Sequence, residues 1–491
     1  MNESPLVTRT DIKLEPDPTR VLIRPFIPTD EGRVTKILAR IASQSDGEVA
    51  EHLEKIRADF ASRHIEVENT FLTRYEAIKH LNFTDAEPSL TRKLLIGSYF
   101  TSEYSLESAA LFNPSMVPHP DQTNLPAGSV RFVMSLRAVG EGHISSVAFR
   151  SGVIDKNSQI SLESSTDFVD NPEFIVDRVF TKKDFFDKLA EEGYVNDYSD
   201  LISLLLDDEF SLQELQTAVS RVHHQQPRLV QSHRITQEQM MGLAYSNYDV
   251  RFDSDIPLEG RVLFPSAPSE KNGIEDARFV RFTEDDGKTK YFGTATAWDG
   301  KTIMPQLIAT DNFQKFKMRT LNGEGAENKG MALFPRRING KYAMISRQDN
   351  ENIFLMYSDR LQFWRDAKMI MKPAYPWEYY QIGNSGSPIE TDAGWLLFTH
   401  GVGAMRRYAI GAALLDKSDP SKVIGRTREP ILVPIDNERE GYVPNVVYSC
   451  GAMRHGDSIV MPYAMADQAT RVAIIRLPEL LSCLSKGNKA C

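Results

Sequence analysis

The chain has 491 residues, of which 41% are hydrophobic and 25% are charged, values close to those of an average globular protein. This composition excludes a disordered or low-complexity chain, and the length predicts either several domains or one large repeat fold with additions. The formal charge of −10, from 57 basic and 67 acidic residues, excludes the broad basic surface of a nucleic-acid-binding protein.

The cysteines and the N-terminal segment narrow the class further. Cys450, Cys483 and Cys491 are too few for a disulfide framework and form no C-x-x-C pattern, so we expect no metal site. Residues 1–20 are polar and lack the apolar region of a signal peptide. No run of about 18 apolar residues occurs that would cross a membrane. We therefore expect a cytoplasmic protein without a membrane or nucleic-acid partner.

Residues 1–100 are predicted to form an N-terminal helical extension, with helices from about Asp30 to Leu81. Ser45 and Glu48 have the spacing of a capping box, which marks a helix start. Apolar residues then recur at helical intervals at Leu53, Ile56 and Phe60.

A second helical block is predicted at about 181–242. Three pairs of residues have the spacing of helix starts, each followed by apolar residues at helical intervals: Thr181 with Asp184, Ser211 with Glu214, and Thr236 with Gln239. Amphipathic helices must cover their apolar faces. We expect this block to pack on the N-terminal helices or to form a subunit contact, the latter giving a homo-oligomer.

The rest of the chain predicts β-structure that repeats. Each unit has a short strand, a Gly-containing turn, a second strand, a polar loop and a third strand. The units begin near Asn113, Asp276, Phe334, Ser387 and Gly451. A period of roughly 50 to 60 residues is typical of a β-propeller blade. We predict an all-β five-bladed β-propeller over 101–480, interrupted at 181–242 and followed by a tail at 481–491. A two-sheet sandwich is the alternative, but it does not explain the repeated register.

In a propeller, the innermost strands of all blades face one central funnel, so equivalent polar residues of different repeats converge there. The polar residues at such positions are Asn113, Arg137, Glu275, Asp276, Lys329, Arg347, Asn384, Ser385, His400 and Asp467. Lys329, Arg347 and His400 form a group of cations near strand ends. Burying them without a partner is costly. Either they bind an anion of phosphate size, or they pair with Glu275, Asp276, Glu378 or Glu390.

The acids of this set are few. Glycoside hydrolysis usually needs two carboxylates with complementary roles, whereas a phosphorylase needs one, because phosphate itself is the nucleophile. One acid beside a cation cluster therefore favours phosphorolysis. Glu438 or Glu440 would be the general base if the chain were a hydrolase, and surface positions on a loop are the structural alternative for both.

Six segments in order carry a resemblance to a known family: NPSMVPHP with a downstream SLRA, NGIEDARF, KGMALFPRRINGKYAMISR, GWLLFTHGV, RRYAIGAALLD and PYAMAD. This order resembles glycoside hydrolase family 130, the β-mannoside phosphorylases and related β-mannosidases. The resemblance runs from about Asn113 to Leu477, apart from the helical insertion. It implies a five-bladed propeller and an enzyme that acts on a β-mannoside oligosaccharide, with inorganic phosphate as co-substrate and no cofactor.

The resemblance also implies roles for individual residues. Asp276, in the position of the family's Glu-Asp-Pro-Arg motif, would be the general acid, with its proton passing through the mannosyl 3-hydroxyl. Lys329, Arg347 and His400 would bind phosphate. The residues that would bind the sugar are Asn113, Arg137, Glu275, Tyr408 and Asp467. The chain departs from the family at Ala277, where the motif has proline, and at Ser346 and Gln348, which flank Arg347 in place of His and Pro.

The sequence and the resemblance leave three hypotheses for the function of the protein. The leading hypothesis is inverting phosphorolysis of a β-mannoside, which releases α-mannose 1-phosphate. The second is a β-mannosidase that uses water, and the third is a non-catalytic carbohydrate-binding propeller. Asp276 beside three cations disfavours the third, because sugar binding alone needs no phosphate site.

Overall fold

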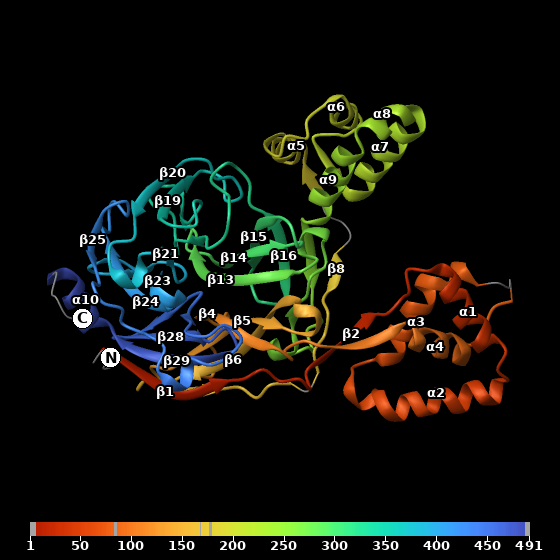
Figure 1. Cartoon of the computed structure of the whole chain (residues 1–491), viewed down its shortest axis with the longest axis horizontal. Helices are drawn as coiled ribbons and strands as arrows, with labels where there is room; N and C mark the ends of the chain where they lie inside the picture. Colours follow the sequence, from red (N-terminus) through yellow and green to blue (C-terminus); the bar gives the residue numbers. More distant parts are fainter. Residues whose placement is uncertain (1–5, 83–85, 167, 176–178, 487–491) are drawn as a thin grey trace.

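The computed structural model describes residues 6–82, 86–166, 168–175 and 179–486, in which antiparallel β-sheet is the main regular structure. The strand groups lie around a common centre, and two helical units project from them (Figure 1). The strands form several separate sheets, so the two-sheet sandwich is not the arrangement found. No helix in the described ranges is long and apolar enough to cross a membrane.

The largest sheet combines two antiparallel series. The first contains β4 (Ala110–Pro118), β5 (Val130–Val139), β6 (Ser145–Ile154), β7 (Ile160–Leu162) and β12 (Val262–Leu263). The second contains β13 (Gly273–Thr283), β14 (Thr289–Trp298), β15 (Ile303–Thr310), β16 (Lys315–Thr320), β11 (Tyr248–Arg251) and β8 (Glu173–Ile175). The two series are joined by a single parallel pair, Gly273 with Ser145.

Two further sheets follow in chain order. Counting the two series of the largest sheet as the first two strand groups, the third group contains β17 (Ala332–Leu333), β18 (Tyr342–Ser346), β19 (Ile353–Ser358) and β20 (Ala367–Met371). The fourth contains β21 (Gln381–Asn384), β22 (Ile389–Thr391), β23 (Gly394–Val402), β24 (Tyr408–Leu415) and β25 (Val423–Arg426). Trp395 and Phe334 pack edge to face between these two groups, with ring centroids 5.1 Å apart.

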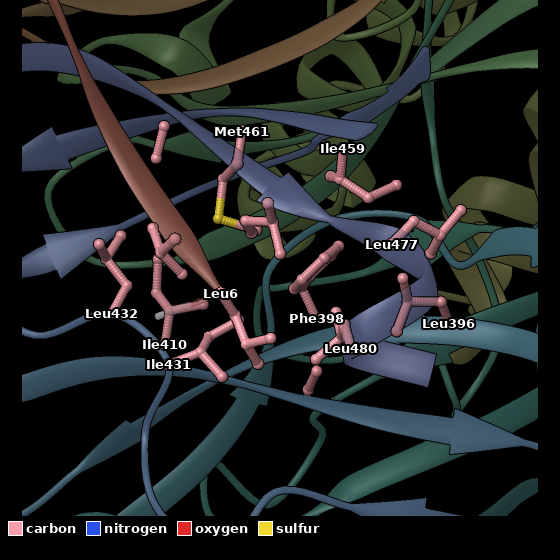
Figure 2. Packing of buried hydrophobic residues seen from close by; sticks show 14 of the residues in the cluster. Leu6, Leu396, Phe398, Ile410, Ile431, Leu432, Ile459, Met461, Leu477 and Leu480 are labelled. Atoms are coloured by element: carbon pink, nitrogen blue, oxygen red, sulfur yellow. The ribbon is translucent and has the colours of Figure 1, made fainter. Parts of the chain in front are cut away.

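The last sheet joins both ends of the described chain. It contains β26 (Val447–Tyr448), β27 (Met453–His455), β28 (Ser458–Met465), β29 (Ala469–Arg476) and β1 (Val7–Leu14). β1 pairs antiparallel with β29, with Val7 opposite Ile475. Leu6, just before β1, packs among Phe398, Ile410 and other apolar side chains of the neighbouring sheet (Figure 2). Residues 7–14 thus belong to the sheets and not to the helical extension predicted for 1–100.

The N-terminal helices form a unit with its own core. They are α1 (Glu31–Ala42), α2 (Asp46–Phe60), α3 (Val67–Ile78) and α4 (Leu90–Tyr99), tied to the sheets through the pair β2 (Val21–Pro25) and β3 (Thr101–Ser105). The predicted capping box at Ser45 is formed: the Ser45 backbone N–H donates to Glu48 at 2.7 Å, and the Glu48 N–H donates to the Ser45 hydroxyl.

The predicted helical insertion forms a second separate unit. It contains α5 (Lys182–Glu191), α6 (Asp197–Leu204), α7 (Leu212–Gln225), α8 (Pro227–Ser232) and α9 (Arg234–Tyr245), with the strand pair β9 (Val179–Thr181) and β10 (Glu209–Ser211). The Ser211 capping box is formed. Thr236, however, lies inside α9, where its hydroxyl accepts a hydrogen bond from Asn196 at 2.8 Å. The unit buries its apolar faces in a core of its own, away from the N-terminal helices (Figure 1).

The end of the chain differs from the predicted tail. α10 (Leu477–Lys486) continues directly from β29, and its Leu480 and Leu484 are buried against the last two sheets. Residues 487–491, the rest of that predicted tail, lie outside the described residues.

A buried glutamate precedes the inner strand in three of the groups. Each lies six residues before a polar inner-strand residue: Glu107 before Asn113, Glu270 before Asp276, and Glu378 before Asn384. The Glu378 carboxylate accepts the backbone N–H of Tyr375 at 3.0 Å and is bound by Arg426 at 2.6 Å. These contacts fix the loop from which β21 begins, and the six-residue interval recurs in three of the groups.

Candidate active site

Two inner strands carry a polar residue on a β-bulge. In β4 the pairing register shifts around Asn113, and in β13 it shifts around Asp276. Both residues have left-handed backbone angles, with φ of 49° and 53°. Most non-glycine residues adopt this conformation at a cost; Asn and Asp tolerate it best, and outside turns it clusters at functional sites. The bulges turn both side chains toward each other, because a bulge re-aims the side chain that it carries.

Asp276 is held by two neighbours from the first strand group. The Asn113 amide donates to its carboxylate oxygen Oδ1 at 2.7 Å, and Nη1 of Arg137 lies 3.3 Å from the same atom. Nη2 of Arg137 also donates to Glu275 at 2.7 Å. The sequence-predicted residues Asn113, Arg137, Glu275 and Asp276 therefore form one hydrogen-bonded cluster.

The charges around Asp276 and Asp467 act on their pKa values in opposite directions. Burial alone would raise the pKa of Asp276, but the cations Arg137, Arg278 and Lys329, together with the Asn113 hydrogen bond, lower it. Burial, and then the charge of Asp276, raise the pKa of Asp467 to about 6. The free protein thus has an ionised Asp276 close to a second carboxyl that keeps a proton in mildly acidic solution.

A second cluster contains two predicted phosphate-binding residues, Arg347 directly after β18 and His400 in β23. Nη1 of Arg347 lies 3.2 Å from Nε2 of His400, and both side chains are buried. The ring of Tyr408 stacks on that of His400, with centroids 6.1 Å apart. Lys329 lies at the start of the same strand group and forms no ion pair within the described ranges, although its charge acts on both Asp276 and Asp467.

Arg278 and Tyr448 connect the two clusters. Nη1 of Arg278 donates to the backbone carbonyl of Asp276 at 3.3 Å, and Nη2 donates to the Tyr448 hydroxyl at 2.6 Å. The Tyr448 ring lies against the ring of His400, with centroids 4.7 Å apart. All predicted site residues are thus linked by contacts or by electrostatic interaction into a single site.

Of the four acids predicted as alternative partners of the cations, Glu275 and Asp276 lie in the site and bind Arg137, whereas Glu378 and Glu390 are engaged elsewhere. Glu378 binds Arg426, and Glu390 binds Arg336 with two hydrogen bonds of 2.9 Å. Glu438 is fully buried, where it binds Arg9 and accepts the Tyr463 hydroxyl at 2.6 Å. Glu440 is exposed. These contacts give Glu378, Glu390 and Glu438 structural roles outside the site.

Several buried polar atoms of the site have no hydrogen-bond partner among the described residues. They are Asn113 Oδ1, Arg278 Nε, Arg347 Nε, Asn384 Oδ1, Ser385 Oγ and His400 Nδ1. Such atoms are costly in a protein interior unless a ligand or water satisfies them. Their concentration here is typical of a site for a polar, hydroxyl-rich or anionic ligand. By contrast, a cavity of about 390 Å³ between α2, α3 and β3 contains none of the predicted residues.

Four residues of the site had no predicted role: Arg278, Tyr448, Asn384 and Ser385. Asn384 and Ser385 were among the polar residues predicted to face the centre, and Asn384 follows Glu378 at the same interval at which Asp276 follows Glu270. Tyr448 gave no such signal, since its contacts with Arg278 and His400 join three strand groups.

Comparison with known proteins gives consistent matches. A family model described as beta-1,4-mannooligosaccharide phosphorylase matches residues 217–486. A 1,2-beta-oligomannan phosphorylase of Thermoanaerobacter sp. (strain X514) is 45% identical over 244 residues, which are 49% of this chain and 79% of the relative. A beta-1,2-mannobiose phosphorylase of Listeria innocua serovar 6a is 29% identical over 72% of this chain and 96% of the relative.

Among solved structures, the beta-1,2-mannobiose phosphorylase from Listeria innocua in complex with beta-1,2-mannobiose matches with a TM-score of 0.47 and 23% identity. The match covers 78% of this chain and 93% of that one.

Proposed function

The chain belongs to glycoside hydrolase family 130, and from this membership we propose that it cleaves a β-mannoside with phosphate and releases α-mannose 1-phosphate. Membership makes the chain a glycoside phosphorylase or glycosidase. The relatives named above are phosphorylases of oligomannan or mannobiose. Their names favour a β-1,2 linkage as the first to assay, followed by the β-1,4 linkage of the family description.

The architecture that we propose for this activity is a five-bladed propeller with one strand group as each blade. Its support is the strand pairing, which gives five antiparallel series, and their position around a common centre (Figure 1). The site residues come from β4, β5, β13, β23, β24 and the segments next to β17, β18 and β28. In this arrangement the inner strands bring residues that are distant in sequence to one point.

The observation that carries the proposal is the acid Asp276 beside two cations, the buried Arg347 and the half-buried Lys329, that have no carboxylate partner among the described residues. Asp276 is within reach of Asn113 and Arg137, while Arg347 and Lys329 have no ion pair among the described residues. We assign the cations Lys329 and Arg347, with His400, to phosphate. Bound phosphate would be the nucleophile, so no second carboxylate is needed to activate water.

The reaction balances with these groups. A phosphate oxygen forms a bond to the anomeric carbon on the face opposite the glycosidic oxygen, and the glycosidic bond breaks with inversion from β to α. The departing oxygen takes a proton that originates on Asp276 and passes through the mannosyl 3-hydroxyl. Asn113, Arg137, Glu275, Tyr408 and Asp467 would hold the mannosyl hydroxyls.

The low pKa of Asp276 in the free protein implies an order of events. Asp276 is ionised because Arg137, Arg278 and Lys329 outweigh its burial. Phosphate adjacent to Lys329 adds negative charge and opposes that field, so the pKa of Asp276 rises when phosphate binds. An acid must carry its proton at the start of the chemical step. Phosphate binding thus prepares Asp276 to act.

Product analysis with and without phosphate tests this function. We expect β-1,2-mannobiose or a longer β-mannoside to give mannose 1-phosphate only when phosphate is present, and ³¹P NMR identifies its anomer. Phosphate-independent release of mannose would instead identify a β-mannosidase. Binding without any cleavage would identify a carbohydrate-binding protein.

The Arg347→Ala variant tests the phosphate assignment. Loss of a charge-assisted hydrogen bond of about 1.5–3 kcal/mol should raise the phosphate KM by roughly 10-fold to 150-fold while mannoside binding survives. Arg336→Ala is the matched control, because Arg336 is paired with Glu390 away from the site. An unchanged phosphate KM in the Arg347 variant would contradict the assignment.

A further inference from the structure

The contact between Arg347 and His400 fixes the protonation state of the histidine. Nη1 of Arg347 lies 3.2 Å from Nε2 of His400, and the two side chains are 5% and 1% exposed. A guanidinium group has five N–H donors and no acceptor. The histidine nitrogen must therefore accept this hydrogen bond, which only a neutral imidazole with its proton on Nδ1 can do.

The surroundings of the ring favour the same state. Burial, followed by the charges of Arg347 and Arg278, lowers the pKa of His400 well below its ordinary value. The rings of Tyr408 and Tyr448 lie against the imidazole, and the negative charge of Asp276 has a smaller effect on it than the two arginines. Two nearby cations and one more distant carboxylate thus favour a neutral ring.

The backbone beside the pair holds it in place. A Cβ atom at Gly383 would lie 2.4 Å from Cε1 and 2.6 Å from Nε2 of His400, and 3.2 Å from Nη1 of Arg347. Contacts below 3.0 Å are not tolerated, so only glycine permits this approach. The backbone at Gly383 therefore covers Nε2, and an oxyanion would have to displace Arg347 to reach that atom.

The opposite edge of the guanidinium is available for an anion. Nε of Arg347 is buried and has no hydrogen-bond partner among the described residues. A Cβ atom at Gly330 would be 3.9 Å from Nε, so this edge faces a residue without a side chain. An arginine binds phosphate best through two parallel N–H groups, and the edge that contains Nε and Nη2 offers such a pair.

We propose that His400 is a positioning residue and not a third phosphate-binding cation: it accepts a hydrogen bond from Nη1 of Arg347 and directs the Nε edge of the guanidinium toward phosphate. The inference rests on the proposed phosphorolysis and refines its phosphate site. Phosphate then binds to two cations, Lys329 and Arg347, and His400 acts only by positioning Arg347.

Two substitutions separate the positioning role from the cationic role. His400→Gln keeps a hydrogen-bond acceptor near the place of Nε2 but never carries a charge, whereas His400→Lys supplies a cation and no acceptor. We measure kcat and the KM values for phosphate and for the mannoside. His400→Lys should raise the phosphate KM at least about tenfold over His400→Gln, the equivalent of about 1.4 kcal/mol. The mannoside KM should be similar in both.

A spectroscopic measurement tests the pair without turnover. In protein labelled with ¹⁵N at histidine, the signals lost in His400→Gln identify the His400 ring. We expect a neutral ring with its proton on Nδ1, both before and after inorganic phosphate is added. A ring protonated on both nitrogens, or a His400→Lys variant that uses phosphate as well as His400→Gln, would overturn the proposal. Phosphate-independent cleavage by the wild type would instead overturn the proposed function, which the ring spectrum does not address.

Discussion

Replacing Asp467 by asparagine should stabilise the folded protein at neutral pH. Burial and the charge of Asp276 raise the pKa of Asp467 from 3.8 to about 6. Each pKa unit corresponds to about 1.36 kcal/mol, so the ionised carboxylate lowers the free energy of unfolding by roughly 3 kcal/mol. Asparagine removes this charge. It also tolerates the left-handed backbone at this position, where φ is 50°.

The sign of this effect depends on pH in a defined way. Below about pH 4 the carboxyl is protonated in both folded and unfolded chains, so the substitution changes little. Between about pH 4 and pH 6 the unfolded chain loses the proton first, and the advantage of Asp467→Asn grows. Above about pH 6 the advantage reaches its full value.

Urea denaturation of wild type and Asp467→Asn, without phosphate or mannoside, measures this difference. The gain at about pH 7.5 should be roughly twice that at about pH 5, as the linkage relation requires. Asp311→Asn, in an exposed turn between β15 and β16, is the control and should show no such trend. Equal or lower stability of Asp467→Asn at about pH 7.5 would refute the electrostatic reasoning. Mannoside binding should weaken in the same variant.

Three further perturbations probe other parts of the molecule. Asp276→Asn keeps the shape of the side chain but removes the proton donor, so the release of mannose 1-phosphate should slow by roughly 10²–10⁴-fold. Activity near that of the wild type would exclude Asp276 as the acid. Gly383→Ala places a methyl group 2.4 Å from the His400 ring. The phosphate KM should therefore rise about tenfold or more, which corresponds to a loss of at least about 1.4 kcal/mol of binding free energy. Unchanged kinetics would show that Arg347 and His400 can move without loss of phosphate binding. Deletion of residues 1–14 removes β1 and Leu6 from the last sheet, and thermal melting should show a lower Tm; an unchanged Tm would mean that β1 adds nothing to the sheet.

The sequence predicted those elements whose causes are local. The capping boxes at Ser45 and Ser211 formed as expected, because their hydrogen bonds join residues three positions apart. Thr236 was wrongly predicted as a helix start: α9 begins earlier, at Arg234, and the Thr236 hydroxyl accepts a hydrogen bond from Asn196, the N-cap residue of α6. β1 was not predicted, because its strand pairing depends on β29, which lies at the other end of the sequence.

Some features of the candidate site could likewise be predicted from the sequence and others could not. Asn113 and Asp276 were predicted to lie close together because they occupy equivalent positions of two repeats, and the structure has a hydrogen bond of 2.7 Å between them. Their left-handed bulges were not predictable, since neither residue is a glycine. The neutral state of His400 was also hidden, because it depends on a contact with Arg347, which lies in another sheet.

The pairing of β1 with β29 has a consequence for how the chain acquires its structure. β1 can pair with β29 only after more than 450 further residues have been synthesised. In the meantime the α1–α4 unit, which has its own core, can fold alone. Closing the last sheet is a contact of very high sequence separation, and such contacts form slowly. Until then the edge of β29 offers unpaired backbone groups, which makes this late stage the one most exposed to misassembly and to chaperone binding.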